Sequence, residues 1–169
     1  MNFLGLIQEI EKLINLSNGD FITLSSGERY AFSRIRNYNI AEIEIFEEKF
    51  NVKLPAEYKN FLMTIGACNL YFGKYQLGIK FYELKEIESF TKEVFINLTN
   101  PFPNFLLIAS NLNNGDVVGY NLFKNSECSL SIYSVEEEYP ENWINCSEYI
   151  TLKQFIEKLL ISDGEDYYL

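Results

Sequence analysis

The chain has 169 residues, of which 47% are hydrophobic and 22% charged, a composition typical of one soluble globular domain with a sizeable core. Because it contains no histidine, Ser-His-Asp and Cys-His catalysis and imidazole metal ligation are excluded. Its 14 basic and 24 acidic residues give a net charge of -10, which disfavours nucleic acid and anionic membranes as partners and favours a basic protein.

Residues 1–39 predict a helix followed by a β-hairpin. Apolar residues recur at helical spacing from Phe3 to Ile14, and the pattern ends at the Asn18-Gly19 turn. Two apolar runs, 21–24 and 29–32, then flank a glycine-containing loop, as in a hairpin. This region also contains all three arginines: Arg29, Arg34 and Arg36. Pairing with the acidic half of the chain, or plain solvation, is the favoured interpretation of this cluster, and anion binding is the alternative.

Residues 40–66 predict two helices with a hinge at Leu54-Pro55. In the first helix, apolar residues recur three and four positions apart, and charged residues, Glu47 among them, fill the other faces. Pro55 suits the first turn of the second helix, and Gly66 suits the left-handed residue that ends it. The two apolar stripes are Ile40, Ile43, Phe46 and Phe50, and then Tyr58, Phe61, Leu62 and Ile65.

The next segment, residues 67–104, predicts mixed structure. Residues 68–77, rich in Tyr, Phe and Gly, indicate a turn, and an imperfect alternation from Ile79 to Glu86 indicates a half-buried strand. A short helix is expected from Glu86 to Phe95. Two prolines between residues 100 and 104 then favour an extended loop.

The remaining elements predict an antiparallel meander and a final helix. Residues 105–110 form a short apolar run, typical of a buried strand, and the Asn114-Gly115 turn joins them to a partner strand over 117–122. A third strand is expected over 128–135. Thr151 and Gln154 form a capping box at the start of the last helix, and residues 162–169 form an acidic tail.

No motif for metal binding or catalysis stands out. Residues 111–116 superficially resemble a calcium loop, but the glycine lies at the wrong offset and no bidentate glutamate follows, so we expect no metal. The chain has no glycine-rich phosphate motif, so we expect no nucleotide cofactor. Nothing singles out a catalytic pair among the 24 acids. We therefore expect a protein that is not an enzyme.

The cysteines and the amino terminus predict a cytoplasmic protein. Cys68, Cys128 and Cys146 are odd in number and form no C-x-x-C pair, as expected of reduced thiols. The first residues lack the basic region of a signal peptide, and no apolar run approaches the roughly 20 residues of a membrane-spanning helix.

The acidic surplus is concentrated between residues 93 and 152, which contain eight acids against one basic residue, Lys124. Within this region, residues 136–143 combine acids with two large aromatics. Aromatics anchor protein interfaces while carboxylates select a basic partner, so this segment predicts a partner-binding site. The alternative is that Trp143 packs inward and the glutamates are merely solvated. The candidate contact residues are Asp116, Glu136, Glu137, Glu138, Tyr139, Glu141 and Trp143.

One pattern in the central helices resembles a known family. An acidic helix is followed by Phe50, then by Leu54-Pro55, Tyr58, Phe61-Leu62 and Gly66, as in the Smi–Knr family of the SUKH superfamily. The resemblance extends over residues 40–161, and residues 1–39 form an extension of the same domain. It implies an α+β fold in one domain, with a central, mainly antiparallel sheet flanked by helices.

The resemblance also implies a function. Bacterial members are typically immunity proteins that bind a toxin domain, often a nuclease, and members outside toxin systems are non-catalytic scaffold or regulatory proteins. We therefore expect an immunity protein that masks a basic cognate toxin, and a scaffold role in cell-wall or signalling assemblies is the alternative. No contact residue follows from the family pattern itself.

Overall fold

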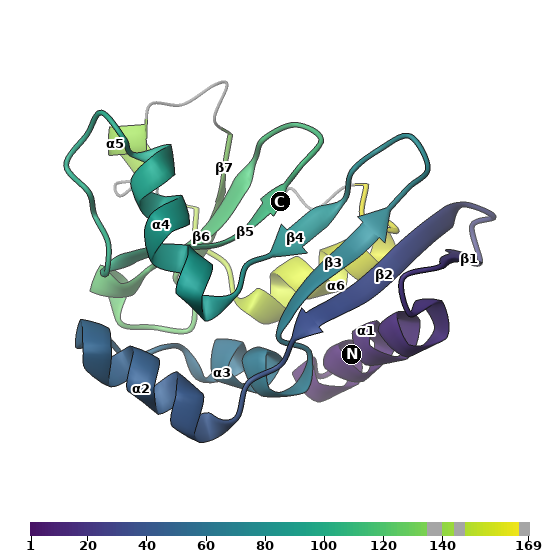
Figure 1. Cartoon of the computed structure of the whole chain (residues 1–169), viewed down its shortest axis with the longest axis horizontal. Coiled ribbons are helices and arrows are strands. Elements are labelled where there is room, and N and C mark those ends of the chain that lie inside the picture. Colours follow the sequence, from purple (N-terminus) through teal and green to yellow (C-terminus); the bar gives the residue numbers. More distant parts are fainter. Residues whose placement is uncertain (135–139, 144–147, 166–169) are drawn as a thin grey trace.

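The computed structural model describes residues 1–134, 140–143 and 148–165, without the side chains of residues 140 and 141 (Figure 1). Its helices are α1 (Phe3–Ser17), α2 (Ile40–Phe50), α3 (Ala56–Thr64), α4 (Leu84–Val94), α5 (Pro140–Trp143) and α6 (Leu152–Ile161), with a short 3-10 turn η1 (Leu122–Lys124). Its strands are β1 (Phe21–Thr23), β2 (Arg29–Arg36), β3 (Ala67–Phe72), β4 (Ile79–Phe81), β5 (Phe105–Asn111), β6 (Val117–Asn121) and β7 (Leu130–Tyr133).

The strands form one sheet in which each strand lies beside its neighbour in the chain and runs antiparallel to it. Short connections favour this arrangement for β1–β2, β3–β4, β5–β6 and β6–β7. Helices α2 and α3 lie between β2 and β3, and α4 lies between β4 and β5. The predicted α+β fold with an antiparallel meander is confirmed. The Asn114-Gly115 turn joins β5 and β6 as expected, with Gly115 at φ 80°.

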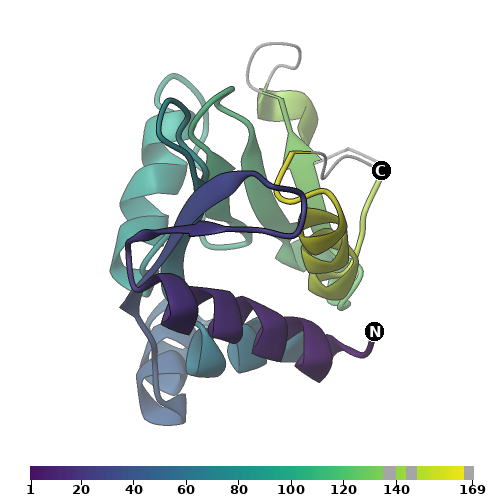
Figure 2. The same cartoon turned by 90° about the vertical axis from the view of Figure 1, so that its right-hand side faces the viewer.

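Helices cover the two faces of the sheet unequally (Figures 1 and 2). On one face, α1, α3 and α6 pack together over the sheet, and α2 packs on α3. On the other face, α4 lies against β5, with α5 close by. Two clusters of buried side chains result: a large cluster on the side of α1, α3 and α6, and a small cluster beneath α4 and α5.

The strands in the half of the sheet formed by β5–β7 are apolar on both faces. Leu106 and Ile108 of β5 lie in the large cluster, whereas the alternate residues Phe105 and Leu107 lie in the small one. This alternation follows from the pleat, which points successive side chains to opposite faces. In the described part of the chain, β1–β4 contribute no residue to the small cluster. The half-sheet β1–β4 is therefore covered on one face.

A row of directly paired residues crosses six strands, and its residue types show where the helices stop covering the second face of the sheet. On β2, β3, β4 and β5 its members are polar, and on β6 and β7 they are apolar. The row consists of Ser33, Asn69, Lys80, Ser110, Val117 and Tyr133, in strand order. Of these, Val117 and Tyr133 belong to the small cluster. Residue type along the row changes where helix α4 begins to shield the sheet.

The two central helices and their hinge are confirmed, but one residue of the hinge differs from the prediction. Glu47 was expected on a solvated face, and it is only 3% exposed. Its Oε1 accepts a hydrogen bond from the backbone N–H of Leu54 at 2.7 Å, and its carboxylate pairs with Lys59 at 3.3 Å and Lys53 at 3.5 Å. Burial alone would raise the pKa of Glu47, but these donors lower it below its ordinary value. Glu47 thus ties α2 to the hinge and to α3.

The segment 67–86 also differs from its prediction. Residues 67–72 form strand β3 rather than a turn, because Cys68 and Leu70 are buried in the large cluster. The expected strand to Glu86 ends at Phe81, and helix α4 starts at Leu84. The side chain of Glu86 accepts the backbone N–H of Glu83 at 2.9 Å, completing a capping box that favours a helix start.

The arginine cluster is partly paired, although with different partners from those expected. Arg34 forms an ion pair with Glu11 of α1 at 3.2 Å, and Arg36 pairs with Glu42 of α2. Both acids lie in the amino-terminal half of the chain, not in the acidic half. The guanidinium of Arg29 lies 6.0 Å from the ring centre of Phe21.

Candidate partner-binding surface

Most of the predicted contact residues lie outside the part of the chain that the structure describes. These are Glu136, Glu137, Glu138 and Tyr139, and the side chain of Glu141. In the sequence they fall between Tyr133 at the end of β7 and Trp143 in α5. Their role in binding a partner stays a prediction.

Trp143 lies inside the fold. Its side chain is 0% exposed and belongs to the small cluster. Its ring stacks on Tyr133, with centroids 4.7 Å apart, and meets Phe95 edge-on at 5.4 Å. Such aromatic pairs add to the free energy gained by burial. Trp143 therefore anchors α5 against the sheet, as in the inward-packing alternative, and offers a partner no exposed surface.

Asp116 also lies inside the fold, in the turn between β5 and β6. It is 2% exposed. Its Oδ2 accepts a hydrogen bond from Asn114 Nδ2 at 2.6 Å, and its backbone N–H donates to Asn114 Oδ1 at 3.0 Å. Aspartate and asparagine commonly stabilise turns through such local bonds. The burial of Asp116 leaves no exposed carboxylate for a partner, and its bonds shape the turn.

Two other acids, one from each half of the chain, stabilise helix starts. Glu127 accepts the backbone N–H groups of Ala56 at 2.6 Å and Glu57 at 3.3 Å, which are the first two residues of α3. Glu57 in turn accepts the N–H of Lys153 at 3.0 Å in the first turn of α6. A carboxylate is favoured at a helix amino terminus, where N–H groups lack partners inside the helix. Glu127, one of the acids of the surplus between residues 93 and 152, therefore holds the start of α3 in place.

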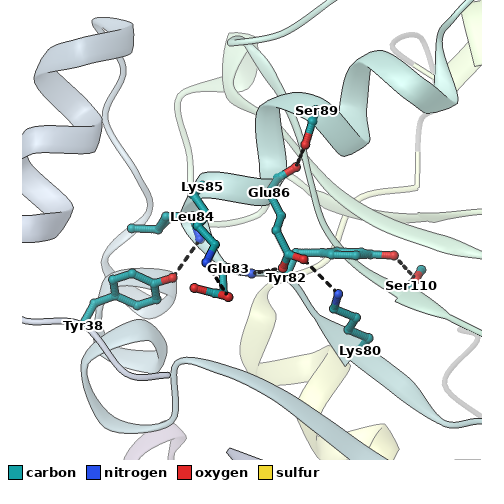
Figure 3. Close-up of polar contacts among 9 residues, drawn as sticks. All are labelled: Tyr38, Lys80, Tyr82, Glu83, Leu84, Lys85, Glu86, Ser89 and Ser110. Atoms are coloured by element: carbon teal, nitrogen blue, oxygen red, sulfur yellow. Dashed lines mark hydrogen bonds and ion pairs between the residues drawn. The ribbon is translucent and has the colours of Figure 1, made fainter. Parts of the chain in front are cut away.

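A polar junction at the start of α4 marks the boundary between the two halves of the sheet (Figure 3). Glu86 points from α4 towards Lys80 of β4 and pairs with it at 3.1 Å. Tyr82 forms a hydrogen bond with Ser110 of β5, with 2.8 Å between the hydroxyl oxygens. The Tyr38 hydroxyl accepts the backbone N–H of Leu84 at 3.0 Å. These bonds fix the amino terminus of α4 on β4, β5 and the segment that precedes α2.

The ionisation states of the residues in this junction suit a structural role, the positioning of α4, and not a catalytic one. Burial is the main cause that raises the pKa of Tyr82 above its ordinary value, so the phenol stays neutral at pH 7. Burial also raises the pKa of Tyr38. Burial alone would raise the pKa of Glu86. The hydrogen bond from the Glu83 N–H and the Lys80 ammonium outweigh burial and lower the pKa below its ordinary value, so the carboxylate stays charged at pH 7. The junction is thus a set of neutral phenols beside two closed ion pairs, Glu86 with Lys80 and Glu83 with Lys85.

Sequence reasoning missed Tyr38, Glu47 and Glu127, because the groups that they contact are brought to them by the fold. The spacing of Glu83 and Glu86 was a signal that could have located the start of α4. Within the described residues, no group of three or more Asp, Glu or Cys side chains could hold a metal ion. In the same part of the chain, no helix is long and apolar enough to cross a membrane.

Two comparisons place the chain among known proteins. Residues 40–156 match the family described as SMI1-KNR4 cell-wall, SUKH_6. A protein of Dickeya dadantii (strain 3937) named Immunity protein RhsIB is 32% identical to this chain over 161 residues, which are 95% of this chain and 96% of that protein. The family match begins at the first residue of α2 and includes the hinged helices that carry the resemblance in the sequence. The chain therefore belongs to the SMI1-KNR4 cell-wall family of the SUKH superfamily.

Proposed function

We propose that this protein is an immunity protein that binds a cognate bacterial toxin domain in the cytoplasm and neutralises it without catalysis of its own. The observation that carries the proposal is the similarity to Immunity protein RhsIB over 95% of this chain and 96% of that protein. The similarity therefore includes most of residues 1–39 and extends beyond the segment that matches the family.

The charge of the chain supports a basic toxin, such as a nuclease with a cationic groove for nucleic acid. A net charge of -10 attracts a positively charged protein over distances of several ångströms and raises the association rate. A nuclease neutralises phosphates with lysine and arginine, so its groove presents the complementary charge.

We assign direct contacts with the toxin to Glu136, Glu137, Glu138, Tyr139 and Glu141. Acids beside an aromatic residue suit the recognition of a basic surface. Asp116 and Trp143 are not in this contact set, because both are buried. Trp143 supports the segment by fixing α5 on the small cluster.

A rescue assay tests the function. The carboxyl-terminal domain of the toxin encoded beside this gene is expressed in a sensitive bacterium with and without this protein. Growth restored by the intact protein, together with a complex on size-exclusion chromatography, is the expected result. If no neighbouring toxin domain is neutralised or bound, the immunity role is refuted and the scaffold alternative is favoured, in keeping with the cell-wall description of the family.

Charge reversal tests the contact set. The triple variant Glu136→Lys, Glu137→Lys, Glu138→Lys should slow association with the toxin domain at least tenfold at low ionic strength, because the steering charge is inverted. The matched control reverses three exposed glutamates elsewhere: Glu28, Glu44 and Glu93. Both variants change the net charge equally, so equal losses in the association rate would show that only the total charge matters and would refute the contact set.

A further inference from the structure

A groove of about 440 Å³ is lined by residues of α1, the β1–β2 hairpin and the end of α6. Figure 2 shows these three elements next to one another. The floor of the groove includes Leu13, Ile22, Leu24 and Leu160, which are partly buried against the large cluster. At its rim, Leu16 near the end of α1 is 64% exposed. Concave apolar surfaces of this size are typical of binding sites. The groove thus leaves apolar side chains open to solvent on three different elements.

The rim of the groove is acidic. Two carboxylates, Glu9 and Asp163, face one ammonium, Lys12, and that ammonium already pairs with Glu9 at 3.2 Å. Tyr71 also lines the groove, and the carboxylates of Asp163 and Glu9 both lie close enough to affect its pKa. Burial chiefly raises the pKa of Tyr71, and the negative charges of Asp163 and Glu9 raise it further. In a chain of net charge -10, an apolar groove with this rim favours a segment that carries basic residues.

A second groove of the molecule shows the opposite charge. It lies between α2 and the start of α4, with a volume of about 300 Å³, and three cations line it: Arg36, Lys49 and Lys85. Among the described residues that line it, Glu42 and Glu88 are the only carboxylates. A basic segment would meet excess positive charge there, so of these two grooves charge complementarity favours the one beside α1.

The position of the groove relative to the shared family segment points to recognition of a particular partner. Of the eleven described residues that line it, ten lie outside residues 40–156, and the exception is Tyr71. The immunity relative, in contrast, aligns with 95% of this chain and so reaches beyond that segment. A surface that selects one partner must differ between proteins of one family, and parts outside the shared segment are free to differ.

From these observations we infer that the groove beside α1 binds a basic, amphipathic segment of the partner protein, with apolar side chains seated on the leucines and lysine or arginine beside Asp163 and Glu9. This inference rests on the proposed function, in which the partner is the toxin. It adds a second contact surface, independent of the acidic residues 136–141.

The central test compares two exposed leucines of α1. Leu16→Lys replaces the apolar rim with a charge that repels the segment, and lysine is well placed near a helix carboxyl terminus, so the fold should persist. Leu4→Lys is the matched control, because Leu4 is 60% exposed on the same helix and does not line the groove. Titration calorimetry with the toxin domain that the intact protein neutralises should show Kd raised about tenfold or more for Leu16→Lys and within about twofold for Leu4→Lys. Equal affinities of the two variants would overturn the inference.

A second variant removes charge without changing shape. Asp163 has a positive φ of 50°, which asparagine tolerates, so Asp163→Asn should fold normally. We expect a loss of affinity of a few fold that disappears at high salt, because screening weakens the attraction that the carboxylate provides. A loss that is the same at all salt concentrations would contradict a charge contact.

A peptide assay separates this inference from the proposed function. The probes are a short amphipathic helix of leucine and lysine, a peptide of the same composition with scrambled order, and a leucine–glutamate helix. Binding of the first probe alone, weakened by Leu16→Lys but not by Leu4→Lys, would support the groove even if no toxin were neutralised. Equal binding of the ordered and scrambled basic peptides would refute it. If the intact protein rescues cells while Leu16→Lys binds the toxin normally, the immunity role is supported and the binding role of the groove is refuted.

Discussion

The two halves of the sheet share one antiparallel meander but bury their strands differently. All five residues of β6 and six of the seven residues of β5 are buried, whereas β2 alternates between buried and more exposed positions. The difference follows from helical cover, because α4 and α5 shield the second face only over β5–β7. The cross-strand row from Ser33 to Tyr133 therefore changes from polar to apolar within a single sheet. Strand sequence depends on local cover as well as on strand pairing.

The largest effect should come from truncating the small cluster. Phe105 is fully buried between Phe95, at 5.8 Å, and Tyr133, at 5.3 Å. Phe105→Ala should lower the free energy of unfolding by about 3–5 kcal/mol, measured by urea denaturation, because it opens a cavity. Phe72→Ala in the one-sided half is the control, since Phe72 belongs to neither buried cluster and is only partly buried. Comparable losses for the two variants would remove the distinction between the halves.

Replacing an apolar by a polar residue, or the reverse, along the cross-strand row should change stability less than Phe105→Ala does. The size of the change should differ between the covered and the uncovered half. Val117→Ser places a hydroxyl in the small cluster and should cost about 2 kcal/mol of stability. Ser33→Val, on the uncovered face, loses one hydrogen bond from Asn69 at 3.3 Å and should change stability by about 0.5 kcal/mol or less. If Ser33→Val proved the more damaging change in thermal or urea unfolding, helical cover would not explain the row.

The smallest effect concerns the junction that holds α4 at the boundary between the halves. Glu86→Gln keeps an acceptor for the capping box but removes the ion pair with Lys80, and should cost about 0.5 kcal/mol at pH 7. Glu86→Ala also removes the cap and should cost about 1 kcal/mol.

The pH dependence of this effect has a defined sign. The pKa of Glu86 in the folded protein lies below its ordinary value of 4.5, so its contribution is present above that value and is lost as pH falls through the folded pKa. The difference in unfolding free energy between the natural protein and Glu86→Gln should therefore shrink below about pH 4.5. A difference that grows on acidification would contradict the ion pair.

Local patterns predicted the helices and the meander well. The stripes of α1, α2, α3 and α6 recur at helical spacing, and the Asn114-Gly115 turn directs the chain into a hairpin. Strand β3 was missed because glycines flank a short aromatic run, and its burial depends on helices elsewhere in the chain. Glu47 was missed for a similar reason, because Lys53, Leu54 and Lys59 supply its partners only after the hinge has folded.

The candidate site was less accessible to sequence reasoning. A tryptophan beside acids is typical of an interface, yet Trp143 of helix α5 packs against Phe95, which is distant in the sequence, and Tyr133 of strand β7. The groove beside α1 draws its lining from both ends of the chain, so no single stretch shows its apolar and acidic character. Only the family pattern, read from the hinge helices, pointed from sequence to function.

The carboxylates at the starts of α3 and α6 link the two helices in series, because α6 depends on α3 and α3 depends on a residue far along the chain. Glu127, more than sixty residues along the chain, completes the first turn of α3, and Glu57 within that turn completes the start of α6. A peptide of α3 alone lacks its acceptor and should show little helicity in water. During synthesis, α3 is therefore expected to become stable only once residue 127 has emerged from the ribosome, and α6 to dock after it.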